Sequence, residues 1–144
     1  MVTINENESL NYKAELFIEN EFVKGYYYSE IKLMHLVWQE RAVGDDYRKP
    51  FLAAYDFSEQ KGGKYFLSDI RKQGIVGPDD RKWFEEDALP KAIERGMIKA
   101  GVVFDGNTFK MYYINMLLKR FMNKGIPMKF FKDTYSAINW ILEK

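Results

Sequence analysis

Short apolar runs alternate with helix-like segments along the second half of the chain, and this alternation constrains the fold more than any other feature of the sequence. Strand-like runs over residues 64–71, 98–106 and 127–133 are each followed by a helix-start signal or by helical periodicity. Such alternation is typical of a sheet covered by helices, because each helix carries the chain back to the edge where the next strand begins.

Three further strand-like runs precede this alternation, over residues 14–20, 22–31 and 32–39. Their short connections favour antiparallel pairing. The last run carries apolar residues on both faces, which is typical of a strand covered on both sides. We therefore predict an α/β fold with a mixed sheet of about five to six strands flanked by helices, in which a β-meander is followed by βα units.

Helical segments are predicted over residues 44–63, 78–84, 89–96, 108–125 and 134–144. Asp45 or Asp46 is a suitable cap for the first helix, and the Gly62-Gly63 pair is predicted to end it. Pro90 lacks a backbone N–H, so we expect it to break or kink the chain between the second and third helices.

The length of 144 residues is sufficient for one domain with a sizeable core, so we treat residues 1–144 as a single domain with a loose tail over 1–12. Hydrophobic residues make up 47% of the chain, which argues against intrinsic disorder. Cysteine is absent, and this excludes disulfides, thiolate nucleophiles and cysteine-ligated zinc.

The charges nearly cancel, with 22 Lys and Arg residues against 21 Asp and Glu residues. A net charge of +1 creates no general field for nucleic acid or an anionic membrane surface, so we expect no nucleic-acid partner. The chain has no apolar run near the roughly 18 to 20 residues that span a bilayer, and the N-terminus does not have the pattern of a signal peptide. We expect no membrane insertion and a cytoplasmic location.

The stretch SDIRKQGIVGPDDRKWF, residues 68–84, is the strongest candidate for a functional site, because ligands often bind outside the carboxyl end of a strand. Asp69 and Arg71 at the strand end are expected to lie near Asp79 and Asp80 at the helix start. Two carboxylates beside an arginine can perform acid–base chemistry, so one hypothesis is a hydrolase or isomerase that uses Asp69 and Asp79. The alternative is structural: Arg71 pairs with Asp69 or with an acid at the helix start, and the acids stabilise the helix terminus.

The sequence lacks the other common patterns of catalytic, metal-binding and phosphate-binding residues. His35 is the single histidine, and no Gly-x-Ser-x-Gly motif supplies a nucleophile for it. With one histidine and no cysteine, a transition-metal site would lack its usual ligands, and the glycines of residues 72–77 lack the Lys-Ser/Thr end of a phosphate-binding loop. We expect no metal and no cofactor.

The run YFLSDIRKQGIVGPDDRKWF, followed by LPKAIERG, a VVF strand and an AINWIL helix, resembles the STAS-like domains of small bacterial proteins over residues 14–143. The resemblance implies a mixed sheet with packed helices, and a role in binding or regulation rather than in catalysis. Among such domains, anti-sigma-factor antagonists carry a phosphorylated serine where the next helix begins. Residues 76–80 here contain no serine or threonine, so this phosphorylation switch is not expected.

The sequence favours a non-catalytic, regulatory or scaffold module that docks a protein partner through residues 72–83. The candidate partner- or ligand-binding residues are Asp69, Arg71, Lys72, Asp79, Arg81 and Trp83. Self-association as a homodimer through the N-terminal strands is a further expectation, since an edge strand invites pairing.

The alternative to partner docking is a carrier that holds a small apolar ligand or lipid between the sheet and the helices. Aromatic residues make up 17% of the chain, more than a small core requires, and they are concentrated at Tyr26–Tyr28 and in residues 108–125. A buried apolar cavity would favour the carrier. A solid core with an exposed aromatic patch would favour the docking module.

Overall fold

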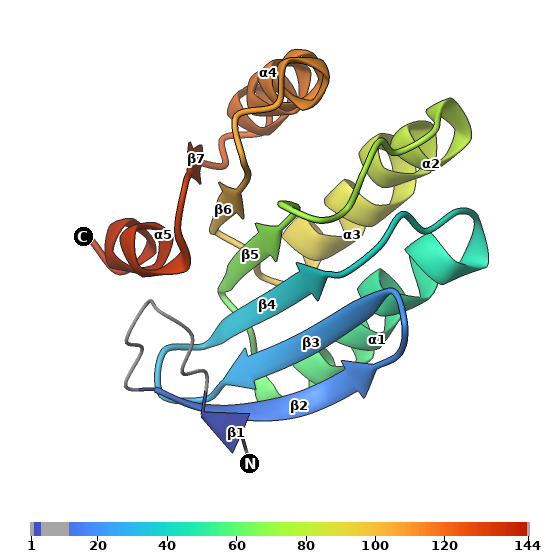
Figure 1. The fold of residues 1–144 in the computed structure, drawn as a ribbon. Coiled ribbons are helices and arrows are strands. Elements are labelled where there is room, and N and C mark those ends of the chain that lie inside the picture. The colour runs from blue at the N-terminus through green and yellow to red at the C-terminus, as the bar shows by residue number, and fades with distance from the viewer. Residues whose placement is uncertain (1, 4–11, 144) are drawn as a thin grey trace.

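The computed structural model describes residues 2–3 and 12–143 of the protein (Figure 1). Its strands are β1 (Val2–Thr3), β2 (Lys13–Glu19), β3 (Val23–Tyr28), β4 (Leu33–Trp38), β5 (Tyr65–Asp69), β6 (Lys99–Val103) and β7 (Met128–Phe131). Its helices are α1 (Asp45–Lys61), α2 (Pro78–Trp83), the π-helical η1 (Phe84–Ala88), α3 (Leu89–Glu94), α4 (Thr108–Asn123) and α5 (Thr134–Ile141). From residue 13 onward, the order of strands and helices is the one that the sequence predicts.

Strands β2 to β7 form a six-stranded mixed sheet whose spatial order follows the chain order. Strands β2, β3 and β4 are antiparallel neighbours, and β4 to β7 are parallel. The predicted mixed α/β fold is thus confirmed. The expected loose tail lies partly outside the described residues, at 1 and 4–11, but Val2 and Thr3 pair with Ala14 and Lys13, so this part of it is a short strand.

The helices divide between the two faces of the sheet for a topological reason. Each crossover from β4 to β7 advances to the next strand in the same direction, and right-handed crossovers then place α1, α2–α3 and α4 on one face. Helix α5 follows the last strand and is not a crossover, so it covers the opposite face, where it packs on β5, β6 and β7 (Figure 1).

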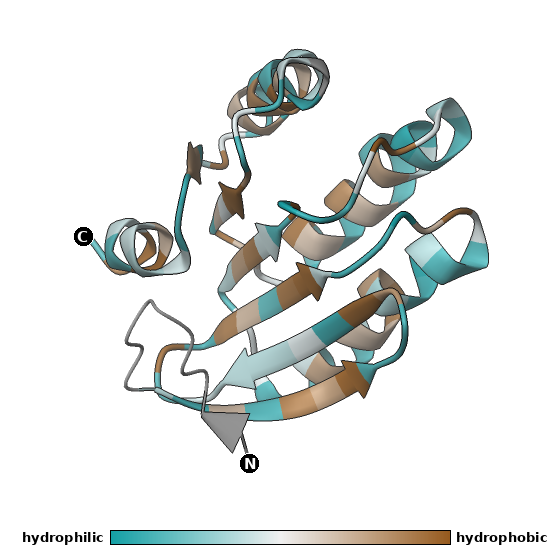
Figure 2. Ribbon diagram, viewed as in Figure 1, coloured by the Kyte–Doolittle hydropathy of each residue, from teal (hydrophilic) through white to brown (hydrophobic). Residues whose placement is uncertain are grey.

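Strand alternation supplies an apolar surface to both faces, as the brown segments of β4, β6 and β7 in Figure 2 show. Leu36 on β4 packs with residues of α1, whereas Leu67 on β5 and Val103 on β6 pack with Ile138 of α5. The tyrosine run of β3 divides in the same way. Tyr27 lies on the α1 face, and Tyr28 lies on the α5 face.

The aromatic residues between the sheet and α1 form one continuous cluster. Trp38 stacks on Tyr47 with ring centroids 5.5 Å apart, and Phe51 contacts Trp83 at 5.8 Å and Phe84 at 5.4 Å. Burial of such large side chains is a main source of stability in a domain of this size. Much of the aromatic surplus therefore belongs to the core.

The predicted break or kink at Pro90 takes the form of the π-helical segment η1 between α2 and α3, and helical residues run without a gap from Pro78 to Glu94. The chain accommodates Pro90 with the π-helical segment η1, in which the Leu89 N–H donates to the Phe84 carbonyl. A π turn is wider than an α turn and tolerates a residue that has no N–H to donate.

The predicted side-chain cap of α1 is wrong. Gly44, with φ of 62°, occupies the cap position without a side-chain hydrogen bond, and Asp45 and Asp46 lie in the first turn. They stabilise the helix through its dipole instead. The predicted end of α1 at Gly62, with φ of 81°, is confirmed.

Candidate functional site

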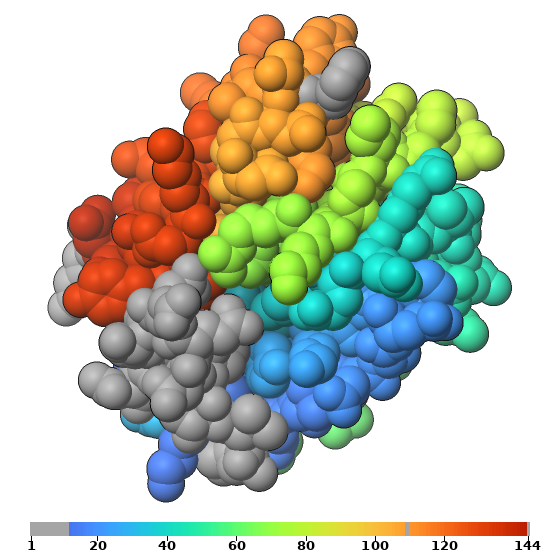
Figure 3. Space-filling view, in the orientation of Figure 1, coloured from blue at the N-terminus to red at the C-terminus, as the bar shows by residue number. Residues whose placement is uncertain are grey.

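The candidate site lies where the carboxyl ends of β5 and β6 meet the start of α2 and the first half of α4. Residues 70–77 form the loop that leads from β5 to α2. In Figure 3 this loop crosses the surface between α4 and the segment of residues 39–44 that follows β4. The site therefore combines parts of the chain that are distant in sequence.

Asp69 and Arg71 form a tight ion pair at the end of β5. The Arg71 Nη2 donates to Asp69 Oδ2 at 2.7 Å, and the Arg71 Nε donates to Oδ1 at 3.0 Å. The backbone N–H of Arg71 donates to the same Oδ1 at 3.1 Å. Asp69 is 5% exposed, so this pairing keeps its charge satisfied inside the protein. The predicted pairing of Arg71 with Asp69 is confirmed.

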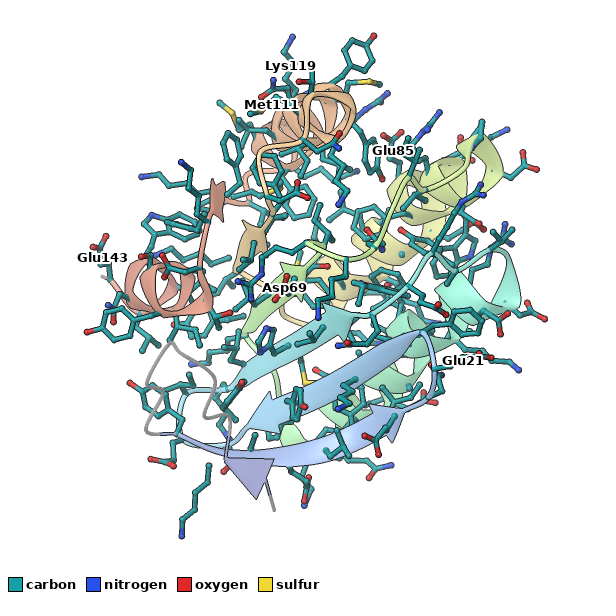
Figure 4. All side chains as sticks on the ribbon, in the orientation of Figure 1. Glu21, Asp69, Glu85, Met111, Lys119 and Glu143 are labelled. Atoms are coloured by element: carbon teal, nitrogen blue, oxygen red, sulfur yellow. The ribbon has the colours of Figure 1, made fainter. Side chains whose placement is uncertain are left out.

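Asp79 does not join this ion pair. Strand alternation places Asp69 on the same face of β5 as Leu67, which packs against α5, whereas α2 lies on the other face of the sheet. Asp79 is exposed at the start of α2, and no hydrogen bond among the described residues links it to Asp69. Figure 4 shows Asp69 at the end of β5. The structure thus does not bring together the two carboxylates of the hydrolase hypothesis.

Asp80, which the sequence analysis placed at the helix start but not among the candidate binding residues, is the structural acid of α2. It is 3% exposed and accepts hydrogen bonds from the Gly44 N–H at 2.9 Å and from Arg48 Nε at 3.2 Å. These bonds attach the start of α2 to the start of α1. Asp80 and Trp83 are three residues apart and share the inward face of the helix, and this spacing is the signal that could have identified it.

A pocket of about 280 Å³, here called the groove, opens between residues 70–81 and α4. Ile70, Gln73, Ile75 and Arg81 line it on the loop side, and Lys110, Tyr112, Tyr113 and Met116 line it on the α4 side. The loop side belongs to the stretch that the sequence analysis selected. The α4 side does not, although the aromatic surplus in residues 108–125 was a signal for it.

Two cationic side chains, Lys110 and Arg81, line the groove. The Lys110 Nζ donates to the Ile70 carbonyl at 2.8 Å and lies 3.8 Å from a carboxylate oxygen of Asp105, which is a long ion pair. The Arg81 Nη1 donates to the Val76 carbonyl at 2.8 Å. Within the described part of the chain, no carboxylate forms an ion pair with Arg81. The Lys110 Nζ also donates to the Arg71 carbonyl at 3.4 Å, so Arg81 supplies the positive charge at the groove that has no ionic partner among the described residues.

The Arg81 guanidinium also lies 5.7 Å from the centre of the Tyr113 ring. A cation over an aromatic face at this distance is favourable and fixes the arginine beside α4. Burial raises the pKa of the Tyr113 hydroxyl, and the charge of Glu85 adds to the effect. The Tyr113 hydroxyl therefore keeps its proton even above the ordinary tyrosine pKa.

The outer edge of the groove is apolar, and we call Ile75, Tyr112 and Met116 the rim. Their exposed fractions are 54% for Ile75, 74% for Tyr112 and 38% for Met116. Large apolar side chains that gather at the surface of a small domain are a common mark of a binding surface.

The remaining predicted site residues lie outside the groove. Lys72 is exposed on the loop. Trp83 faces α1, where the Arg48 guanidinium lies 5.4 Å from the centre of its ring, so it supports the helix contact and does not line the groove. Arg81 is the predicted residue that the structure places at the groove.

Comparison of the chain with protein-family models, with curated proteins and with solved structures finds no match. The described residues contain no group of three or more potential metal ligands. None of the helices that the structure describes is long and apolar enough to cross a membrane.

Proposed function

We propose that the protein is a non-catalytic binding module, of the regulatory or scaffold kind that the STAS-like resemblance implies, and that it docks a protein partner through the rim of the groove. The observation that carries this proposal is the exposure of Ile75, Tyr112 and Met116 on two facing elements. A partner that covers these side chains gains hydrophobic free energy at the centre of a polar surface, the usual arrangement of an interface.

The state of the charged groups supports binding over catalysis. Both oxygens of Asp69 are engaged by Arg71, and both oxygens of Asp80 accept hydrogen bonds from elsewhere in the fold. Asp79 is exposed and lies apart from them. A general acid or base must have its proton within reach of a substrate, and carboxylates held in internal pairs are poorly placed for that task.

The interior favours docking over the alternative of a lipid carrier. Two cavities between the sheet and the helices have volumes of about 50 Å³ each. Pockets that enclose a drug-sized ligand usually measure roughly 300 to 1,000 Å³. A lipid would require the core around Phe51 and Phe121 to open. We place the module in the cytoplasm, since a chain without cysteine suits a reducing compartment.

The docking surface can be tested with a photo-crosslinking amino acid at position 112, in the full chain expressed in its native cells. We expect one crosslinked product of defined mass, and we expect Ile75→Asp to abolish it because a charge then faces the apolar centre of the interface. The matched control places the same amino acid at Tyr135, which is 52% exposed on α5 at the opposite face.

Equal crosslinking from positions 112 and 135 would contradict the assignment of the surface. A product with twice the mass of the chain would replace the foreign partner with a second copy of this protein. That outcome would instead agree with the homodimer that the sequence suggests.

A further inference from the structure

Gln73 is a buried polar residue whose side chain has no partner. It is 6% exposed, and its backbone N–H donates to the Ile70 carbonyl at 3.1 Å, but its side-chain amide forms no hydrogen bond with any described residue. Its side-chain nitrogen and oxygen are not among the described polar atoms that are sealed from solvent without a partner, so the amide is open to the space beside it. An open amide that the protein leaves unbonded is available to a ligand.

The position of Gln73 shows where such a partner would lie. Gln73 lines the groove and also an inner cavity of about 50 Å³ beneath it. The two spaces adjoin, because Ile70, Val76 and Tyr113 also line both. Gln73 therefore lies between the groove at the surface and the inner cavity.

Other unpartnered polar groups surround the same cavity. Tyr47 of α1 and Ser68 of β5 line the inner cavity, and Tyr47 is 3% exposed. Among the described residues, the hydroxyls of Tyr47, Ser68 and Tyr113 form no hydrogen bond, like the amide of Gln73. Four elements of the fold thus place hydrogen-bonding residues without a partner among the described residues around one small space.

The chemistry of the walls defines the ligand. Arg81, which lacks an acidic partner, and Lys110 favour an anionic group at the opening. Apolar and aromatic side chains make up most of the remaining wall, which favours a planar apolar body. The amide and hydroxyls favour a hydrogen-bonding substituent at the inner end. The volume limits the whole ligand to a size close to one aromatic ring.

We propose that the groove and its inner cavity bind a small aromatic carboxylate that carries a hydroxyl or amide substituent. Arg81 and Lys110 bind the carboxylate, and Gln73 with the neighbouring hydroxyls binds the substituent. This inference goes beyond the docking function and does not rest on it, because the ligand is held by the floor of the groove and the partner by its rim.

The test uses 4-hydroxybenzoate as the probe, titrated into the ¹⁵N-labelled full chain and followed by two-dimensional NMR. We expect the largest shifts at the Gln73 side-chain amide and at the backbone amides of residues 73–76 and 110–116. Arg81→Gln and Gln73→Leu should each weaken binding at least tenfold. Lys119→Gln, which removes an exposed cation from α4 outside the groove, should leave the affinity unchanged (Figure 4).

Two further probes check the chemistry. The uncharged 4-hydroxybenzamide should bind at least tenfold more weakly than 4-hydroxybenzoate, because Arg81 and Lys110 would lose their anion. N-acetyl-tyrosine presents the carboxylate and ring of a peptide C-terminus and should also bind more weakly. Tighter binding of N-acetyl-tyrosine would overturn the proposal in favour of a partner's chain terminus.

Absence of shifts at Gln73 with millimolar 4-hydroxybenzoate, or equal binding by wild type and Arg81→Gln, would overturn the proposal and leave water as the partner of Gln73. The docking function would be unaffected by this failure. Gln73→Leu distinguishes the two proposals, since this residue is buried below the rim: the substitution should weaken binding of 4-hydroxybenzoate while crosslinking from position 112 persists.

Discussion

Gln73 on the loop after β5 and Asp80 in the first turn of α2 are both buried polar residues, with exposed fractions of 6% and 3%, yet their hydrogen bonding differs. Asp80 accepts hydrogen bonds from the Gly44 N–H and from Arg48, so each of its oxygens has a partner. Within the described chain, the Gln73 amide has none. Asp80 faces α1, and Gln73 faces the groove.

The difference between Asp80 and Gln73 shows that residues with a structural role and residues available for binding lie within one short segment, residues 73–80. A buried polar group with all its partners present holds elements together, and its removal leaves those partners unpaired. The Gln73 amide has no partner among the described residues and is not sealed from solvent, so it is free to hydrogen-bond with water or with a ligand. The α1 side of the segment is therefore structural, and the groove side is available for a ligand.

The largest expected effect comes from Asp80→Ala. The substitution leaves the Arg48 guanidinium and the Gly44 N–H without their acceptor, and we expect the free energy of unfolding to fall by about 3 kcal/mol. Urea denaturation followed by circular dichroism measures the change. The matched control is Asp79→Ala, an exposed acid in the same helical turn, which should change stability by less than about 0.5 kcal/mol. Similar losses for the two variants would remove the distinction between the two acids.

A second prediction concerns Tyr47, whose hydroxyl lines the inner cavity. Burial raises the pKa of Tyr47 well above its ordinary value, with smaller contributions from Tyr113 and Asp80. Above pH 10 the unfolded tyrosine ionises while the folded one keeps its proton, so stability present at neutral pH is lost as the pH rises. Tyr47→Phe should reduce the loss between pH 9 and pH 11 by about 1.4 kcal/mol, measured by urea denaturation at each pH.

The control for Tyr47 is Tyr55 on the same helix, whose hydroxyl donates to the Ala88 carbonyl at 2.5 Å. At pH 7, Tyr55→Phe should cost about 1 kcal/mol because the carbonyl loses its donor, whereas Tyr47→Phe should cost almost nothing. An equal loss of stability in the two variants at pH 7 would mean that the Tyr47 hydroxyl has a partner, such as a bound water. It would weaken the contrast between the structural side and the groove side of the domain.

The smallest expected effect has the opposite sign. Gln73→Leu replaces an unpartnered amide with an apolar group of similar size, so the ligand-free protein should gain about 0.5 kcal/mol of stability. Thermal unfolding of the free protein measures this gain. A loss above about 1 kcal/mol would indicate that Gln73, like Asp80, has a structural role.

The sequence predicted the order of strands and helices because the signals that specify them are local. The apolar run of residues 98–106 and the glycine pair at the end of α1 each act within a few residues, and the structure contains both signals. The irregularity at Pro90 was predicted, but not that it would be a π-helical segment without a gap in the helix. Packing of η1 and α3 against the core keeps the helix continuous, and this contribution is not visible in the local sequence.

The candidate site was predicted only on its loop side. Residues 68–84 carried a recognisable strand-to-helix turn, and Arg81 does line the groove. Lys110 and Tyr112 come from a helix that the sequence presents as a separate unit, so their approach to the loop could not be deduced. Asp69 and Asp79 were expected to meet because they are close in sequence, but strand alternation directs Asp69 to the α5 face.

By itself, the sequence determined the α/β class, the mixed sheet and most boundaries of the helices and strands, because periodicity and turn chemistry depend on neighbouring residues. Only the tertiary structure decided which acid is anchored, which face α5 covers and which side chains surround Gln73. These outcomes depend on crossover handedness and on strand register, which bring together residues as distant as Tyr47, Gln73 and Tyr113. Burial then determines which polar groups find partners inside the fold and which remain available to a ligand.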